Sequence, residues 1–164
     1  MKTDRDLAIL GLLVGRHLLT RGVRLATAES CTGGWVAKAV TDVAGSSQWF
    51  AEGWVTYSNE SKHLRLGVPV TVLQRHGAVS EATVAAMARG ALVRSRAGIA
   101  LAVSGIAGPG GAVEGKPVGT VWFAWAARAG RGVRVRTQCK RFRGDRAAVR
   151  LSAALVALQG VLIQ

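Results

Sequence analysis

The sequence predicts an α/β fold, a single-domain α/β/α sandwich around a mixed β-sheet of about five strands. Five short β-prone segments alternate along the chain with segments whose apolar residues recur at helical spacing. The last two of these strands are joined by Gly130-Arg131-Gly132, which is typical of a hairpin and would supply an antiparallel pair. A length of 164 residues, 49% of them hydrophobic, with no repeat or linker, suits one domain spanning residues 1–164.

The first third of the chain predicts two helices and two strands. Residues 4–21 carry apolar side chains along one side at helical spacing, and a glycine follows as a stop signal. Residues 23–28 are apolar at every second position, as in a strand, and the periodicity becomes helical over residues 32–43. Residues 53–57 form the second predicted strand.

The middle of the chain predicts three helices and a central strand. Residues 59–66 and 71–76 are expected to form short helices that end at glycine. Ser80 is expected to cap a long alanine-rich helix over residues 81–96. Residues 98–103 form a nearly continuous apolar run, which indicates a strand buried on both faces of the sheet.

The last third begins with a loop rich in Gly and Pro over residues 104–117. Residues 120–127 and 133–142 are the two strands of the predicted hairpin, and residues 145–162 form a final amphipathic helix. Ligands of α/β folds collect where the carboxyl ends of strands meet loops. We therefore expect the site among the loops that follow Thr27, Val55 and Val103.

The most pronounced compositional feature is a net charge of +13, with an isoelectric point near 11.5. Such a charge favours nucleic acid or another polyanion as a partner. The basic residues are nevertheless spread over several predicted elements, and the few aromatic residues include a single tyrosine, so a stacking platform for bases is poorly supported. Nucleic acid is therefore an unlikely partner, and a nucleic-acid-binding or competence-linked module stays open as the alternative to an enzyme.

The remaining composition limits cofactors and location. Two cysteines, Cys31 and Cys139, and three scattered histidines make no metal-ligand pattern, so we expect no metal. Acidic residues stand near the N-terminus where a signal peptide would be basic, and this predicts the cytoplasm. The apolar helical segments are too short, or too interrupted by Arg and Gly, to span a bilayer, so no membrane is expected. These apolar helices also favour a homodimer or a higher homo-oligomer.

The segment after the first strand gathers Ser30, Cys31, Thr32, Gly33 and Gly34 at a junction between a strand and a helix. Backbone N–H groups are unpaired at such a junction and the helix dipole adds partial positive charge, so a developing oxyanion is favoured there. The structural alternative makes Ser30 or Thr32 an N-cap and places the glycines in a tight turn. A thiol at a helix N-terminus can also be nucleophilic, which makes Cys31 a second candidate.

Three further groups carry chemistry. Lys62 can be a general base if burial lowers its pKa, and Tyr57, as a buried phenol, could relay a proton; the alternative is an ordinary surface lysine. The loop that begins at Ser104 contains Gly105 and Gly108, which permit close approach to a ligand, but its spacing matches neither a P-loop nor a dinucleotide fingerprint. Arg146 could clamp a phosphate bidentately, although a lone arginine in so basic a chain is usually a surface residue.

Five motifs occur in order along the chain: Glu29-Ser30-Cys31-Thr32-Gly33-Gly34, Val55-Thr56-Tyr57-Ser58-Asn59 with Lys62, Gly77-Ala78-Val79-Ser80, Ser104-Gly105-Ile106-Ala107-Gly108-Pro109, and Lys116-Pro117-Val118-Gly119-Thr120. Together they closely resemble the CinA C-terminal domain family in its stand-alone form, the nicotinamide-nucleotide amidases. The resemblance covers nearly the whole chain. Longer members carry a further N-terminal domain that this chain is expected to lack, and Ser104 stands where many relatives have Thr.

The resemblance implies hydrolysis of nicotinamide mononucleotide (NMN) to nicotinic acid mononucleotide and ammonia, in pyridine nucleotide (NAD) recycling. It implies a serine–lysine amidase without metal or cofactor, in which Ser30 is the nucleophile, Lys62 its base, and Tyr57 an aid to the proton path. N–H groups around residues 32–34 are expected to form the oxyanion hole, and Arg146 with the loop of residues 105–111 to hold the phosphate. An inactive paralogue that kept the fold stays open.

Overall fold

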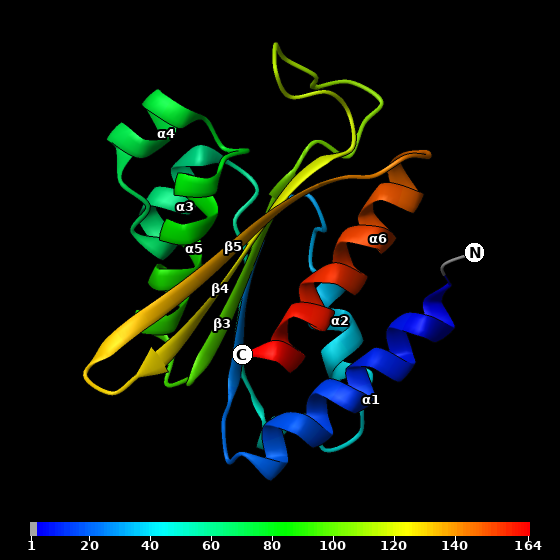
Figure 1. Ribbon diagram of the computed structural model, residues 1–164, viewed down its shortest axis with the longest axis vertical. Helices are drawn as coiled ribbons and strands as arrows, with labels where there is room; N and C mark the ends of the chain where they lie inside the picture. Colours follow the sequence, from blue (N-terminus) through cyan, green and yellow to red (C-terminus); the bar gives the residue numbers. More distant parts are fainter. Residues whose placement is uncertain (1–2) are drawn as a thin grey trace.

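The computed structural model describes residues 3–164, and its centre is a five-stranded sheet in the order β2-β1-β3-β4-β5 (Figure 1). The parallel strands are β1 (Leu25–Glu29), β2 (Phe50–Val55) and β3 (Ile99–Gly105). The hairpin strands β4 (Thr120–Ala129) and β5 (Gly132–Arg141) are antiparallel and lie at one edge. The prediction of a mixed sheet that ends in a hairpin is confirmed.

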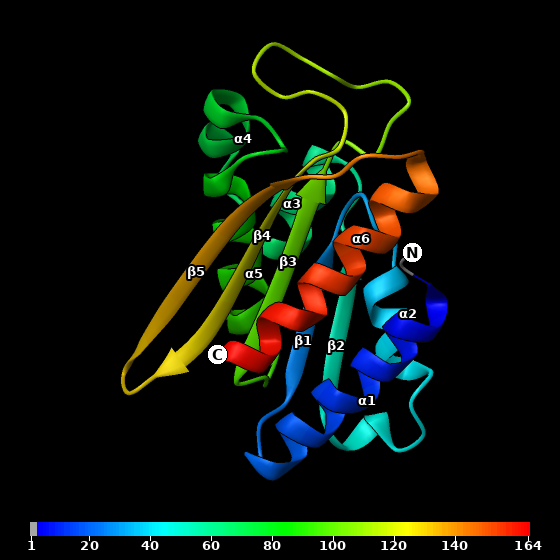
Figure 2. The same cartoon turned by 45° about the vertical axis from the view of Figure 1, so that its right-hand side comes forward.

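Helices cover both faces of the sheet, as Figure 2 shows. One face is covered by α1 (Asp4–Thr20), α2 (Trp35–Thr41) and α6 (Arg146–Gln159), the last continued by a 3₁₀ turn over Gly160–Ile163. The other face is covered by α3 (Asn59–Leu66), α4 (Val70–His76) and α5 (Glu81–Arg94). The fold is therefore the predicted α/β/α sandwich, with a hydrophobic core on each side of the sheet.

The second core positions α3, which carries Lys62. Alanines of the central strands face α5, and their small side chains let this helix lie close to the sheet. A Cβ at Gly90 of α5 would overlap the carbonyl oxygen of Leu66 at the end of α3, so only glycine fits there. Tight packing against α5 therefore fixes the position of the end of α3 and which of its side chains are buried.

Two predicted boundaries need correction. β2 covers Phe50–Val55 instead of residues 53–57, because it pairs with β1 from Leu25 opposite Phe50 to Glu29 opposite Val55. Residues 31–34 form a turn, so helix α2 begins at Trp35 instead of residue 32, and it ends at Thr41 instead of residue 43. Its N-cap residue, Gly34, has φ of 93° and supplies no side-chain cap, so neither Ser30 nor Thr32 caps this helix. The other predicted helices and the Ser80 cap are confirmed within a few residues.

One helical segment corrects the expectation that no segment is suited to a membrane. Residues 146–163 are long and apolar enough to cross a bilayer by length and composition alone. Within this window, 56% is buried inside the structure, and side chains such as Val149, Ala153 and Leu158 are fully enclosed. They pack against the sheet and α1. A buried core helix can meet the same criteria of length and apolar composition as a membrane-spanning helix.

Candidate active site

The three parallel strands end side by side, which brings their following loops together. Glu29 of β1 lies opposite Val55 of β2 and Val103 of β3, so the carboxyl ends of the three parallel strands lie next to one another. A pocket of about 190 Å³ opens there. Seven of the predicted site residues line it: Ser30, Cys31, Tyr57, Lys62, Ser104, Gly105 and Arg146. The loops thus meet at one pocket as expected, and its role as the active site stays a prediction.

Ser30 and Lys62 form a buried pair in this pocket. Lys62 lies on the first turn of α3, is 1% exposed, and places its Nζ 3.0 Å from the Oγ of Ser30. The same Nζ donates to the carbonyl oxygen of Thr56 at 2.8 Å and approaches that of Tyr57 at 3.5 Å. Two N–H groups of an amine can therefore face carbonyls while its third position faces the serine hydroxyl.

The environment of Lys62 makes its neutral form accessible. Burial lowers the pKa of the amine from 10.5 to about 8, since a desolvated ammonium is disfavoured. Within residues 3–164 the amine has no carboxylate partner, and the ion pair seen there joins Lys38 and Asp42 on the surface. A lysine held in this way can accept a proton from Ser30 near neutral pH. The alternative of an ordinary surface lysine is wrong.

Cys31 lies beside Ser30 but in a different environment. Its side chain is buried among the apolar residues between the sheet and helices α2 and α6. Burial raises the pKa of the thiol to about 12, so the thiolate is scarce at neutral pH. None of the histidines lines the pocket. The geometry therefore favours Ser30 over Cys31 as the attacking group.

Tyr57 differs from its prediction. The expectation of a buried phenol is wrong, because the residue is 60% exposed. A part for Tyr57 in the proton path stays a prediction. Its hydroxyl lies 2.9 Å from the Nη2 of Arg146 at the pocket mouth, while its carbonyl oxygen is the atom that faces Lys62. Tyr57 thus contributes its main chain to the lysine and its side chain to the rim.

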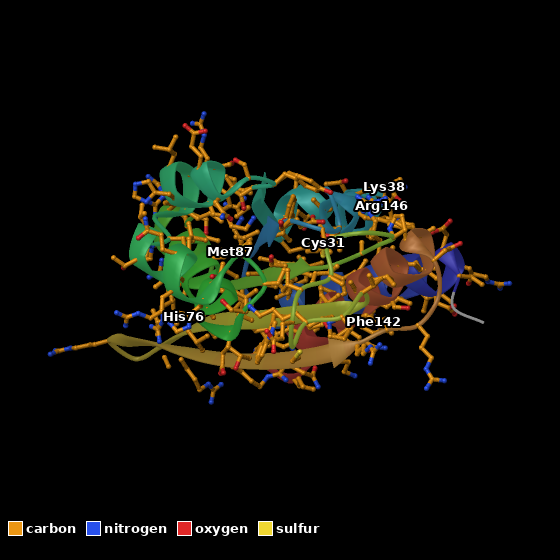
Figure 3. The ribbon with its side chains drawn as sticks, turned by 90° about the horizontal axis from the view of Figure 1, so that it is seen from above. Cys31, Lys38, His76, Met87, Phe142 and Arg146 are labelled. Atoms are coloured by element: carbon orange, nitrogen blue, oxygen red, sulfur yellow. The ribbon has the colours of Figure 1, made fainter. Side chains whose placement is uncertain are left out.

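Arg146 is the first residue of α6 and lines the pocket together with Cys31, near which Figure 3 labels it. Its Nη1 donates to the carbonyl oxygen of Gly108 at 2.9 Å, so Gly108 holds the arginine without lining the pocket. Asp145 caps α6 by accepting from the N–H of Ala148. A fixed cation at the mouth suits an anionic end of a ligand, and its role in phosphate binding stays a prediction.

A residue that the sequence interpretation did not single out, Glu29, organises the turn below the pocket. Its fully buried carboxylate accepts four hydrogen bonds, from the Thr32 hydroxyl and from the N–H groups of Gly34, Val36 and Ala37, at 2.7 to 3.0 Å. An acidic residue at a position where an apolar strand ends was the available signal. Glu29 replaces a side-chain cap for α2.

This arrangement narrows the predicted oxyanion hole. The Gly34 N–H is taken by Glu29, and the Gly33 N–H donates to the carbonyl oxygen of Ser30 at 3.0 Å. Thr32, Gly33 and Gly34 are not among the residues that line the pocket. Among the described residues, the Thr32 N–H is the donor of residues 32–34 that has no protein acceptor.

Ser104 closes the far side of the pocket. Its hydroxyl donates to the carbonyl oxygen of Ala78 at 2.8 Å, which fastens the end of β3 to the segment before α5. Ala78 and Val79 contribute to the lining, so this third motif of the sequence forms a wall of the site. Within residues 3–164 no cluster of three or more His, Cys, Asp or Glu residues could hold a metal ion.

The match to known proteins agrees with this geometry. The profile of the CinA C-terminal domain matches residues 9–164. The chain belongs to the CinA C-terminal domain family. All five motifs that carried the resemblance fall inside the matched range, and four of them contribute lining residues to the pocket or, through Gly108, hold its mouth.

Relatives in this family are similar to this chain over nearly their full length. The Escherichia coli (strain K12) protein "Nicotinamide-nucleotide amidohydrolase PncC" is 56% identical over 157 residues, which cover 96% of this chain and 93% of that protein. The Pseudomonas putida protein of the same name is 50% identical and is covered to 93%, as is this chain. The crystal structure of "competence/damage inducible protein CihA" from Agrobacterium tumefaciens has a TM-score of 0.91 at 42% identity, covering 97% of this chain and 96% of that one.

Proposed function

We propose that this protein is an amidohydrolase that converts NMN to nicotinic acid mononucleotide and ammonia. The single observation that carries the proposal is the buried pair of Ser30 and Lys62, 3.0 Å apart, at the base of a pocket rimmed by Arg146. Relatives 50% and 56% identical over more than nine-tenths of the chain bear the name nicotinamide-nucleotide amidohydrolase, and this supports the choice of substrate.

The first half of the reaction is acyl transfer to Ser30. Neutral Lys62 takes the hydroxyl proton while the Ser30 Oγ attacks the carboxamide carbon, and the carbonyl oxygen becomes an oxyanion. The lysine ammonium then gives its proton to the carboxamide nitrogen as the C–N bond breaks. Ammonia leaves, an ester joins the nicotinoyl group to Ser30, and Lys62 is neutral again.

The second half repeats the proton transfer with water. Lys62 takes a proton from a water molecule that attacks the ester carbon, and the second tetrahedral intermediate collapses. The proton returns to the Ser30 Oγ as the ester bond breaks, which releases the nucleotide as a carboxylic acid that gives its remaining proton to solvent. Each proton transfer at the bonds that form and break passes through the one amine, so these steps require no second acid or base.

The phosphate and the positively charged ring of NMN would interact with Arg146 and Lys62. Arg146 would bind the phosphate, whose distance from the reacting bond lets it orient the substrate. The positively charged pyridinium ring and Arg146 would both disfavour the charged form of Lys62, and so help to keep the base neutral. The net charge of +13 would attract an anionic nucleotide, with a modest effect at cellular salt.

The experiment that tests this proposal measures both products with purified protein. We expect ammonia and nicotinic acid mononucleotide to form in equal amounts from NMN, without added metal or cofactor. Formation of nicotinamide and a ribose phosphate instead would mean cleavage of the glycosidic bond and would contradict the proposal. Absence of any product would favour an inactive paralogue.

We infer in addition that residues 1–164 act as one amidase domain, in the cytoplasm, as a homodimer. Four large apolar side chains of α1 are about half exposed, and they offer a face for a second copy: Ile9, Leu12, Leu13 and Leu19. The two free cysteines, Cys31 and Cys139, suit a reducing compartment. Light scattering on the eluted protein tests the dimer, and a monomeric mass would contradict it.

A further inference from the structure

Arg150, one turn beyond Arg146 on α6, contacts the main chain of the turn that carries Ser30. Its Nε donates to the carbonyl oxygen of Cys31 at 3.1 Å, and its Nη2 donates to that of Thr32 at 2.8 Å. The guanidinium also lies over the Trp35 ring, 5.3 Å from its centroid. One rigid planar group therefore holds two successive peptide groups.

The same turn is fixed from its other side. The buried Glu29 carboxylate accepts from the N–H of Gly34, and the Gly33 N–H donates to the carbonyl oxygen of Ser30. Between Glu29 and Arg150 the turn has most of its polar main-chain groups engaged. Its conformation therefore depends on both charged side chains. Removing Arg150 breaks two hydrogen bonds at the turn, whereas removing the Glu29 carboxylate would leave four donors without their acceptor, so Arg150 is the residue to change.

The contact with Arg150 also sets the direction of one N–H group. The Cys31–Thr32 peptide is trans, so its N–H points opposite to its carbonyl oxygen. Because Arg150 holds the Cys31 carbonyl on the side of α6, the Thr32 N–H is directed away from α6. A cation bound to the carbonyl also polarises the peptide, which makes that N–H a stronger donor.

We propose that Arg150 is a positioning residue, which fixes the Cys31–Thr32 peptide so that the Thr32 N–H binds the oxyanion formed when Ser30 attacks. The inference rests on the proposed amidase function and adds a residue to it. Arg150 does not line the pocket of Ser30; it lines a separate groove of about 460 Å³ with Gly33, Trp35 and Lys38. It therefore acts on the rate of the chemical step and leaves substrate binding unchanged.

The test is Arg150→Ala, assayed with NMN in the presence and absence of ethylguanidinium. We expect kcat to fall about 10- to 100-fold while KM stays within about twofold, since a donor is misplaced but no substrate contact is lost. The groove beside Trp35 is open to small solutes, so ethylguanidinium should raise the kcat of Arg150→Ala about tenfold. Ethylammonium, with the same charge but no planar fork, should restore nothing.

Controls separate this role from others. Lys38→Ala removes a cation from the same groove, where Lys38 pairs with Asp42, and it should leave kcat and KM unchanged. If Arg150→Ala does not fold, Arg150→Lys keeps the charge and the stem but not the planar fork, and it should show the same loss of kcat with KM unchanged. Wild-type kcat in either folded variant, a rise in KM alone, or a loss in Arg150→Ala that ethylguanidinium does not reduce would overturn the proposal. Failure of the wild-type protein to hydrolyse NMN would instead refute the proposed function.

Discussion

The pH dependence of turnover follows from the burial of Lys62. The amine is 1% exposed, and burial lowers its pKa from 10.5 to about 8. With the ordinary value, about one amine in 3,000 would be neutral at pH 7, whereas a pKa of about 8 leaves about one in ten neutral. The fraction of active base is thus about 300-fold larger, which is equivalent to about 3 kcal/mol. The packing of α3 buries Lys62, and it thereby increases the fraction of the neutral base.

The assay is the initial rate of ammonia release from NMN between about pH 6 and pH 10. We expect kcat/KM to rise about tenfold per pH unit at first and to level off above about pH 8, because only the neutral amine is the base. Circular dichroism at each pH would verify that the protein stays folded. A rise that continues to about pH 10 would mean that Lys62 keeps an ordinary pKa, and a flat profile would refute its role as base.

Three further predictions concern the phosphate, stability and charge. Arg146→Ala should lower kcat/KM for NMN by about 30- to 100-fold, the equivalent of about 2–3 kcal/mol for a lost charge-assisted contact, and it should scarcely affect nicotinamide riboside; equal rates for both substrates in the wild type would contradict this. Because the unfolded chain keeps the Lys62 proton up to a higher pH, the free energy of unfolding should rise between about pH 8 and pH 10.5, and Lys62→Met should remove this rise in urea titrations. A gain that persists in Lys62→Met would assign it to other groups. DNA binding, measured by fluorescence anisotropy, should vanish near physiological salt; tight binding there without amidase activity would support the nucleic-acid alternative.

The secondary structure could be predicted because its signals are local. Apolar periodicity placed the helices and strands, and Ser80 before the alanine-rich segment marked the start of α5. The start of α2 could not be placed in the same way. Its N–H groups are satisfied by Glu29, which lies five to eight residues earlier and has no recognised capping spacing.

The site was only partly predictable, because burial depends on distant packing. Ser30 and Lys62 were proposed from the resemblance, but their separation of 3.0 Å depends on how α3 packs against α5. The exposure of Tyr57 depends on Arg146, 89 residues later, which holds its hydroxyl at the rim. Arg150 is one of 22 lysines and arginines, and nothing near it in the sequence distinguishes its contact with the turn 118 residues earlier.

The identity of the attacking atom is the central claim, and two adjacent single substitutions test it most directly. The rate of ammonia release from NMN is measured for Ser30→Ala and for Cys31→Ala, each with and without a thiol-alkylating reagent. We expect Ser30→Ala to lose most of the activity, and Cys31→Ala to keep a substantial rate, since the raised pKa of the buried thiol makes it a poor nucleophile. Alkylation should not change the rate of Cys31→Ala, because the thiol that remains, Cys139, does not line the pocket. An inactive Cys31→Ala together with an active Ser30→Ala would contradict the serine–lysine mechanism.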